Sequence, residues 1–245
     1  MVTITNLKQI REEEVFSIIN NGWVDFRMLD LRGTNFSGMV LNKVDFSGSD
    51  LSDTSFKGAT LKNCIFSECR MMNVNFENSY IFKTDFLASE IVEAKFQKSS
   101  IVNSKFLTQL YYTDFSGANL KSVNFFDANM VEVIFSNCML KDVGFEWIER
   151  FIDVDFSNTD LSKNVSFIGT VLNKAEGTKA FTTYFGGFPV SYIPEVGKVF
   201  YTPARKTFSL KEFSVFIELR EDDDKKELKA MHSYFKKMKK LVKNN

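Results

Sequence analysis

Large apolar residues recur at every fifth position through the middle of the chain. Phenylalanine occupies every tenth position without interruption, at residues 26, 36, 46, 56, 66, 76, 86, 96 and 106. Midway between these positions lie the aliphatic residues Leu31, Leu41, Leu51, Leu61, Met71, Ile81, Ile91 and Ile101. A period of five matches neither the 3.6-residue period of a helix nor the two-residue period of a strand. The pattern therefore predicts a backbone that turns a corner every five residues and points one large side chain inward from each side.

The same rhythm continues to about residue 161, with two slips of a single residue. After a deletion it resumes as Leu110, Phe115, Leu120, Phe125, Met130, Phe135, Leu140 and Phe145, and after an insertion as Phe151, Phe156 and Leu161. Two residues before most of the large residues the side chain is small, as at Thr34, Ser49, Ala59, Cys64 and Cys69. We expect these small side chains to point inward as well.

Corners that repeat in one direction produce a solenoid, whose coils stack at about the 4.8 Å spacing of neighbouring strands. A three-sided coil would place phenylalanine over leucine, whereas a four-sided coil places phenylalanine over phenylalanine. Like side chains fill a narrow interior evenly, so the four-sided coil is favoured. The fold prediction is an all-β solenoid of about seven coils, a quadrilateral β-helix, between residues 24 and 168.

The repeat units resemble those of a known family. Asp45-Phe46-Ser47-Gly48, Asp50-Leu51-Ser52-Asp53 and Ala118-Asn119-Leu120-Lys121 are similar to the A(D/N)LXX units of the pentapeptide-repeat family. The resemblance covers about 145 residues. It implies a right-handed quadrilateral β-helix, and it leaves the function open because this family is defined by shape more than by activity.

Charge and proline content both change near residue 170. Residues 21–170 have 14 basic and 19 acidic side chains, residues 171–245 have 15 and 9, and the whole chain has zero formal net charge. All three prolines, Pro189, Pro194 and Pro203, lie beyond that point. We therefore divide the chain into an N-terminal helical cap (1–23), the β-helix (24–168) and a non-repeat α+β extension (169–245).

The two end segments are predicted to cover the open ends of the solenoid, because an end coil otherwise exposes its core. Residues 6–20 are predicted to form a capping helix. Phe213, Val215, Ile217 and Leu219 alternate as in a strand. The last segment is predicted to be a basic amphipathic helix beginning near Asp224, with the apolar stripe Leu228, Met231, Phe235, Met238 and Val242.

The sequence offers little catalytic chemistry. His232 is the only histidine, and it is predicted to occupy a solvated position of the last helix. Cys64, Cys69 and Cys138 fall at small inward positions, which predicts buried, inert thiols. No dinucleotide or P-loop motif occurs. We expect no enzyme activity, no metal and no cofactor. Because no signal peptide or membrane-spanning run is apparent, we expect a cytoplasmic protein without a transmembrane segment.

The residue after each large one should point outward, and on two neighbouring faces it is often apolar. One predicted line consists of Met72, Val92, Tyr111, Val131 and Ile152, and the adjacent face adds Leu87, Leu107 and Phe126. Together these residues would form a larger contiguous apolar surface than the singly scattered hydrophobic residues of an ordinary monomer. The favoured interpretation is that the C-terminal segment folds back over it, and the alternatives are a homodimer face and a partner-binding site.

The family resemblance also suggests partners. Some pentapeptide-repeat proteins, the quinolone-resistance type, are rods that resemble B-DNA and engage DNA gyrase or topoisomerase IV. The resemblance therefore implies a non-enzymatic rod that binds protein, and it suggests that the protein modulates a topoisomerase. Direct binding of nucleic acid by the rod is not expected. One alternative is an adaptor or targeting module of the effector type. The other is binding of nucleic acid or anionic lipid through the last helix, with Lys236, Lys237, Lys239 and Lys240.

Overall fold

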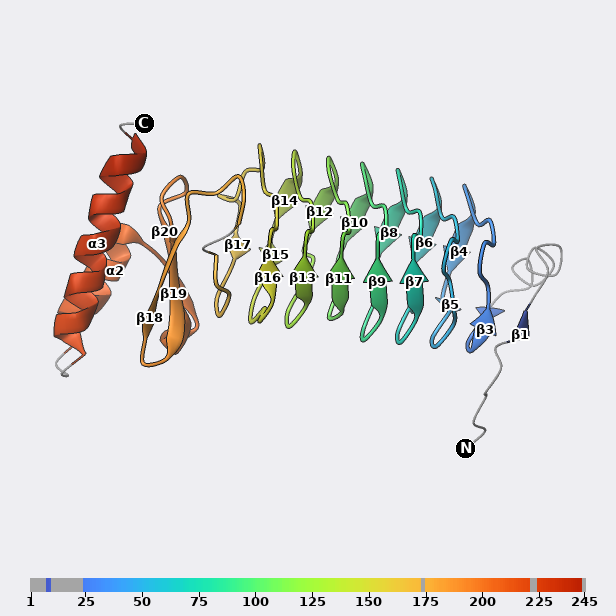
Figure 1. The fold of residues 1–245 in the computed structure, drawn as a ribbon, viewed down its shortest axis with the longest axis horizontal. Coiled ribbons are helices and arrows are strands. Elements are labelled where there is room, and N and C mark those ends of the chain that lie inside the picture. Colours follow the sequence, from blue (N-terminus) through green and yellow to red (C-terminus); the bar gives the residue numbers. More distant parts are fainter. Residues whose placement is uncertain (1–7, 10–23, 173–174, 221–223, 244–245) are drawn as a thin grey trace.

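The structure, a computed structural model, describes residues 8–9, 24–172, 175–220 and 224–243. Over these residues the chain forms a rod of stacked coils, followed at one end by a small sheet and two helices (Figure 1). Most of the capping helix predicted over residues 6–20 lies outside the described residues. Within that range β1 (Lys8–Gln9) is a strand, and it pairs in parallel with β3 (Leu29–Asp30) at the first coil.

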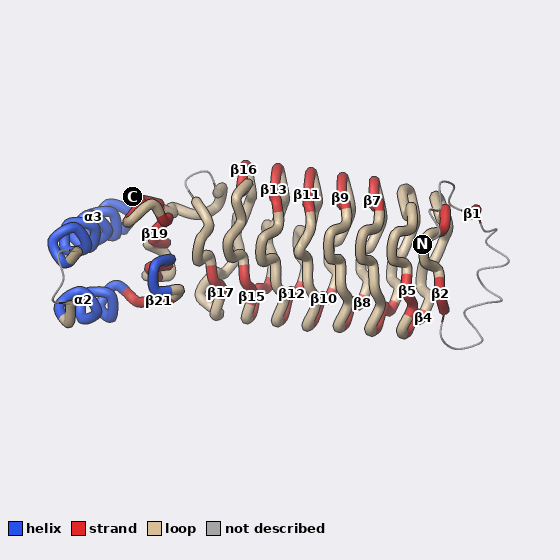
Figure 2. Tube along the Cα trace, turned by 90° about the horizontal axis from the view of Figure 1, so that it is seen from below, coloured by secondary structure: helices blue, strands red, loops and turns tan. Residues whose placement is uncertain are grey.

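Two parallel ladders run along the rod, on opposite sides of it (Figure 2). The longer one has six strands: β4 (Val40–Asn42), β6 (Thr60–Lys62), β8 (Tyr80–Phe82), β10 (Ser100–Val102), β12 (Asn119–Lys121) and β14 (Met139–Lys141). The other has five: β7 (Arg70–Met72), β9 (Glu90–Val92), β11 (Gln109–Tyr111), β13 (Asn129–Val131) and β16 (Phe151–Ile152). Two short pairs complete the coils: β2 (Val24–Asp25) with β5 (Val44–Asp45), and β15 (Val143–Gly144) with β17 (Val165–Ser166).

The register of the ladders confirms a four-sided coil. Leu41 pairs with Leu61 and Leu61 with Ile81, so each residue meets the residue 20 positions later. The predicted deletion shortens one coil, which pairs Ile101 with Leu120. The six strands of the longer ladder mark about six turns, against about seven predicted. The phenylalanine columns extend beyond that ladder at both ends. The coils at the two ends do not contribute a strand to the ladder, so counting its strands gives fewer turns.

Phenylalanine rings fill the solenoid in two stacked columns, as predicted. The Phe86 and Phe106 rings are parallel within 10° at 4.5 Å between centroids, while Phe96, from the opposite side of the coil, meets Phe106 edge-on at 5.7 Å. All three side chains are fully buried. Offset stacking within a column and edge-to-face contact between columns are the arrangements that aromatic quadrupoles favour.

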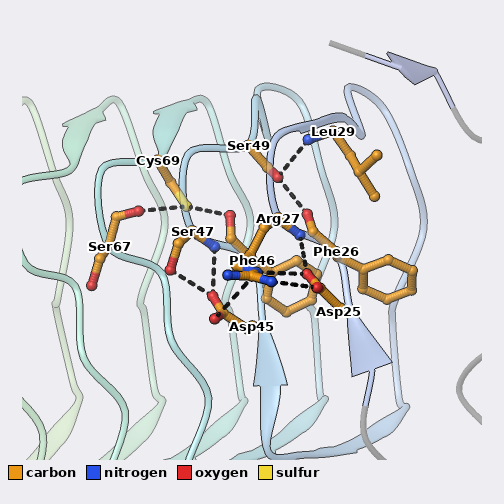
Figure 3. A network of polar contacts seen from close by, with 10 residues as sticks. All are labelled: Asp25, Phe26, Arg27, Leu29, Asp45, Phe46, Ser47, Ser49, Ser67 and Cys69. Carbon is orange, nitrogen blue, oxygen red and sulfur yellow. Dashed lines mark hydrogen bonds and ion pairs between the residues drawn. The ribbon is translucent and has the colours of Figure 1, made fainter. Parts of the chain in front are cut away.

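The small inward residues connect one coil to the next. The Ser49 hydroxyl donates to the carbonyl oxygen of Phe26 at 2.6 Å and accepts from the amide of Leu29, while the Cys69 thiol lies 3.0 Å from the carbonyl oxygen of Phe46 (Figure 3). These contacts satisfy polar groups that burial would otherwise leave unpaired. The prediction that the three cysteines are buried is confirmed.

An antiparallel sheet covers the C-terminal end of the solenoid. Its order is β18 (Phe181–Phe185), β19 (Phe188–Ile193), β20 (Lys198–Tyr201) and β21 (Lys206–Ser209), and the 3₁₀ helix η1 (Thr202–Ala204) joins the last two strands. Phe200 meets Phe167 of the last coil edge-on at 5.4 Å, and Ile193 joins the same core. The neighbouring residues Tyr192 and Tyr201 face the opposite side of the sheet, toward the helices. The sheet thus has an apolar layer on each face.

The prediction of a strand from Phe213 to Leu219 is wrong, because this segment lies in and directly after helix α2 (Leu210–Glu218). Ser209 and Glu212 form a capping box at its start: each side chain accepts from the other residue's backbone amide. Phe213 and Ile217 are buried, whereas Val215 and Leu219 are exposed. Residues that alternate over this length also include pairs at the i, i+4 spacing of a helix, such as Phe213 and Ile217. The capping box at Ser209 therefore decides between strand and helix.

Helix α3 (Lys225–Lys243) packs its apolar stripe on this extension. Leu228, Met231 and Phe235 are buried in a cluster with Tyr192 and Phe213. The prediction of a solvated His232 is wrong. Its side chain is buried, with Nε2 3.0 Å from the carbonyl oxygen of Leu210.

Candidate functional site

The predicted apolar line is a continuous column on the five-stranded ladder. Met72 pairs with Val92, Val92 with Tyr111, Tyr111 with Val131, and Val131 with Ile152. Each of these residues follows a buried apolar residue of its strand, so its side chain points out of the rod. We call the outer surface of this ladder, with the column along its middle, the docking face.

The side chains of the column are accessible, whereas its carbonyl groups already have partners. Met72 is 39% exposed, and the other four residues are half-buried. The carbonyl oxygen of each column residue accepts from an amide of the preceding coil, for example Val92 from Asn73 at 2.8 Å and Val131 from Tyr112 at 2.9 Å. This face therefore offers side chains, and not free carbonyl groups of the column, to solvent.

The favoured explanation for the column, that the C-terminal segment folds back over it, is wrong. Helices α2 and α3 lie beyond the sheet at the end of the rod, well away from β7 to β13 (Figure 1). The methionine and phenylalanine side chains expected to cover the column, Met231 and Phe235, are buried in the cluster of the extension. The reason is that the sheet β18–β21 has a second apolar face of its own to bury.

An acidic column flanks the apolar one, at the corner where the chain leaves this ladder. It comprises Asp53, Glu93, Glu132 and Asp153, with Asn73 and the 53% exposed Tyr112 at the intervening coils. All six residues have positive φ, between 51° and 62°. This column is not among the residues predicted from the sequence, although each of its members lies two positions after a large inward residue.

The opposite flank has mixed charge. Its outward positions are Arg70, Glu90 and Arg150, separated by Gln109 and Asn129. The docking face is therefore apolar along its middle, acidic along one edge and mixed along the other.

A cavity of about 400 Å³ adjoins the N-terminal end of the column, where Met72 and Val92 meet Arg32, Asp53 and Glu93. The Arg32 guanidinium forms a two-pronged ion pair with Asp30, with N–O distances of 2.7 and 2.8 Å. This hydrogen bonding lowers the pKa of Asp30. The charge of Arg32 is thus already paired within the chain, whereas no ion pair involves Asp53 or Glu93 among the described residues.

The second group of predicted site residues lies on the adjacent face. Leu87 and Phe126 are 45% and 39% exposed, and Leu107 is half-buried. The amide of Ala88 donates to the carbonyl oxygen of Leu107 at 2.9 Å, which places Leu87 and Leu107 on successive coils. A corner of the coil separates them from the docking face, so the structure brings the eight residues together as two columns.

The four lysines of the predicted basic helix lie on α3. Lys236, Lys237 and Lys240 are exposed and Lys239 is half-buried. Because Leu228, Met231 and Phe235 are buried, α3 presents its lysine-rich side to solvent, together with Tyr234. None of the helices in the described ranges is both long enough and apolar enough to cross a bilayer.

The potentially reactive side chains are buried and engaged. Burial raises the pKa of the Cys64 thiol to about 11 and of the Cys69 and Cys138 thiols to about 12. Burial and the nearby charge of Lys236 lower the pKa of His232. Among the residues that the structure describes, no three His, Cys, Asp or Glu side chains are grouped so that they could hold a metal ion.

Stacked four-sided coils with two phenylalanine columns and two parallel ladders define a quadrilateral β-solenoid, here with an α+β extension. A family model for pentapeptide repeats, in 8 copies, matches residues 30–68, 40–78 and 108–143. The solenoid is therefore built of pentapeptide repeats, as the sequence resemblance indicates. No curated protein matches the sequence significantly.

Several solved structures are similar to this chain at low identity. HetL, a pentapeptide-repeat protein involved in heterocyst differentiation regulation in the cyanobacterium Nostoc sp. strain PCC 7120, is 13% identical, with a TM-score of 0.32 over 67% of this chain and 93% of that one. Full-length QnrB1, a plasmid-mediated fluoroquinolone resistance protein, is 16% identical, with a TM-score of 0.30 over 69% and 76%. A pentapeptide-repeat protein from the Arabidopsis thaliana thylakoid lumen is 24% identical, with a TM-score of 0.22 over 46% and 72%.

Proposed function

We propose that this protein is a non-catalytic rod that binds another protein through its docking face. The observation that supports this most directly is the column from Met72 to Ile152: five apolar side chains in register, open to solvent, with no segment of the described chain packed on them. Partners cover exposed apolar patches of this kind in other proteins. A non-catalytic role is supported by the burial of the three thiols and of His232.

The solenoid is suited to such a role because it is rigid. The phenylalanines of the core contact rings of neighbouring coils, and most corners of the described coils are tied to the next coil by backbone hydrogen bonds. A rigid surface loses little conformational entropy when it binds. The column residues, one on each coil, would therefore present a fixed pattern of side chains to the partner.

We propose a type II topoisomerase, DNA gyrase or topoisomerase IV, as the first partner to test, on the sequence resemblance to the quinolone-resistance rods. The assay is gyrase supercoiling with added protein, with and without a fluoroquinolone. Inhibition alone, or rescue from the drug, supports this partner. If micromolar protein has no effect in either format, the topoisomerase is excluded and an adaptor or targeting role takes its place.

The docking face itself is tested by the double substitution Val92→Asp and Val131→Asp. Val102→Asp is a matched control, because Val102 is also half-buried and outward-pointing but lies in β10 of the opposite ladder. We expect loss of partner binding, or of a homodimer measured by sedimentation velocity, in the double variant alone. Unchanged mass, stability and binding in the double variant would show that the column is not a binding surface.

A second candidate function is binding to an anionic surface through α3, which the exposure of Lys236, Lys237 and Lys240 favours. Because the apolar side of α3 is buried, such binding would rest on attraction between the exposed lysines and anionic groups, and added salt should weaken it. The test is a titration of DNA and of liposomes at increasing salt. If neither binds at low salt, this function is excluded.

A further inference from the structure

We propose that the docking face receives a basic, amphipathic α-helix of the partner, lying along the axis of the rod with its cationic edge on the acidic column. This inference rests on the proposed function and specifies the chemistry of the partner. Three properties of the face lead to it: the satisfied backbone, the spacing of the apolar column, and the charge of its two flanks.

The satisfied backbone argues against recognition by strand addition. A peptide that extends a sheet binds through free amide and carbonyl groups along a strand edge. Here the carbonyl groups of Val92, Tyr111 and Val131 already accept from the preceding coil, and both edges of β9, β11 and β13 are paired within the ladder. The partner therefore contacts a surface of side chains.

The spacing of the column matches a helix better than a strand. Neighbouring strands lie about 4.8 Å apart, so the four steps from Met72 to Ile152 span roughly 19 Å. A helix rises about 5.4 Å per turn and covers that length with roughly 13 residues. Side chains on one face of an extended strand are about 6.7 Å apart, so a strand loses register within two coils. One apolar side chain per helical turn can thus meet one residue per coil.

The charges of the flanks indicate which helix fits. Glu93, Glu132 and Asp153 line one edge, and none of them has an ion-pair partner among the described residues, whereas Arg70 and Arg150 interrupt the other edge. A helix with lysine or arginine along one flank would pair with the acidic edge. Tyr112, in the middle of that edge, offers an aromatic face to a cation.

The probe is a synthetic helical peptide of about 14 residues, with leucines at i, i+4, i+7 and i+11 and lysines along one flank. One control peptide has glutamate in place of each lysine, and another has the same composition with alternating strand spacing. Binding to the full-length protein is measured by fluorescence anisotropy. We expect the basic helical peptide alone to bind, and to bind less tightly as salt increases.

The acidic column is tested by Glu93→Lys with Glu132→Lys. Lysine already occupies corners with positive φ at Lys43, Lys83 and Lys98, so the fold accommodates the change. The matched control is Glu68→Lys with Asp127→Lys, which are exposed acidic residues at another corner with the same positive φ.

We expect the first pair to weaken binding of the basic peptide by about ten-fold. The control pair, at the corner that borders the opposite flank, should weaken it by less than about two-fold, because the cationic edge of the peptide lies on the acidic column and exposed charges are screened with distance. Val92→Asp with Val131→Asp should abolish binding. The inference is overturned if the acidic or strand-spaced peptide binds as tightly, if no peptide binds, or if both charge-reversal pairs have equal effects.

Failure of this inference can be separated from failure of the proposed function. If no peptide binds but the valine double variant still loses a protein partner or a dimer that Val102→Asp retains, the docking face stands and the helix is refuted. If the basic peptide binds the valine double variant as tightly as the unaltered protein, the docking face itself is refuted.

Discussion

The sharpest test of the core concerns two adjacent phenylalanines. Phe125 is fully buried, stacked on Phe106 and Phe145 at 5.1 and 5.0 Å and edge-on to Phe115 and Phe135. Phe126, the next residue, points outward and is 39% exposed. The same substitution at both positions therefore compares the inside of the solenoid with its outside.

We expect Phe125→Ala to lower the free energy of unfolding by about 3–5 kcal/mol, because it removes a buried ring and leaves a cavity between coils that cannot close. The cavity stays open because the rings of Phe106 and Phe145, on either side of it, belong to coils whose spacing is fixed by the backbone ladders. Phe126→Ala should cost about 0.5 kcal/mol or less, since its ring is partly solvated before and after unfolding.

The assay is equilibrium unfolding in urea, followed by far-UV circular dichroism. With a slope of about 2 kcal/mol per molar urea, Phe125→Ala should lower the midpoint by about 2 M and Phe126→Ala by no more than about 0.3 M. Equal shifts for the two variants, or a shift below about 0.5 M for Phe125→Ala, would refute the assignment of inward and outward positions.

Two further predictions concern titratable groups. Because the pKa of His232 is lowered in the folded state, the folded protein binds fewer protons, so stability should be full above about pH 6.5 and fall at lower pH. His232→Gln, which keeps a donor for the carbonyl of Leu210, should flatten urea midpoints measured between pH 5 and 8, and an unchanged slope would contradict this origin. Cys64, Cys69 and Cys138 should not react with a thiol reagent at pH 8 in the native protein, since burial raises the pKa of each thiol. All three should react after unfolding in guanidinium, and rapid native reaction would contradict their burial.

Much of the rod follows from local repetition. Phe86 and Phe106 could be assigned to one column from the sequence because, of the three-sided and four-sided coils, only the four-sided coil stacks like side chains on like. The inward position of Ser49 follows from the same count, and its hydrogen bond to Phe26 explains why a small polar residue is tolerated there. A one-dimensional stack places every contact a fixed number of residues away, so the sequence period already contains the tertiary contact.

The extension beyond residue 170 does not repeat, and there the local pattern was insufficient. Phe213 and Ile217 fit a strand and a helix equally well, and the reciprocal cap of Ser209 and Glu212 decides for the helix. His232 looks solvated among lysines, but the side of α3 on which it lies packs against α2.

By itself the sequence determined the period, the four columns, the buried thiols and the outward direction of Val92 and Val131, because each depends on contacts between successive coils. The acidic edge follows the same period, because Glu93 and Glu132 each lie two positions after a large inward residue. Only the tertiary structure decided that the apolar column stays open. That outcome depends on where the extension buries its own apolar faces, and it is set by packing between segments that no sequence period relates.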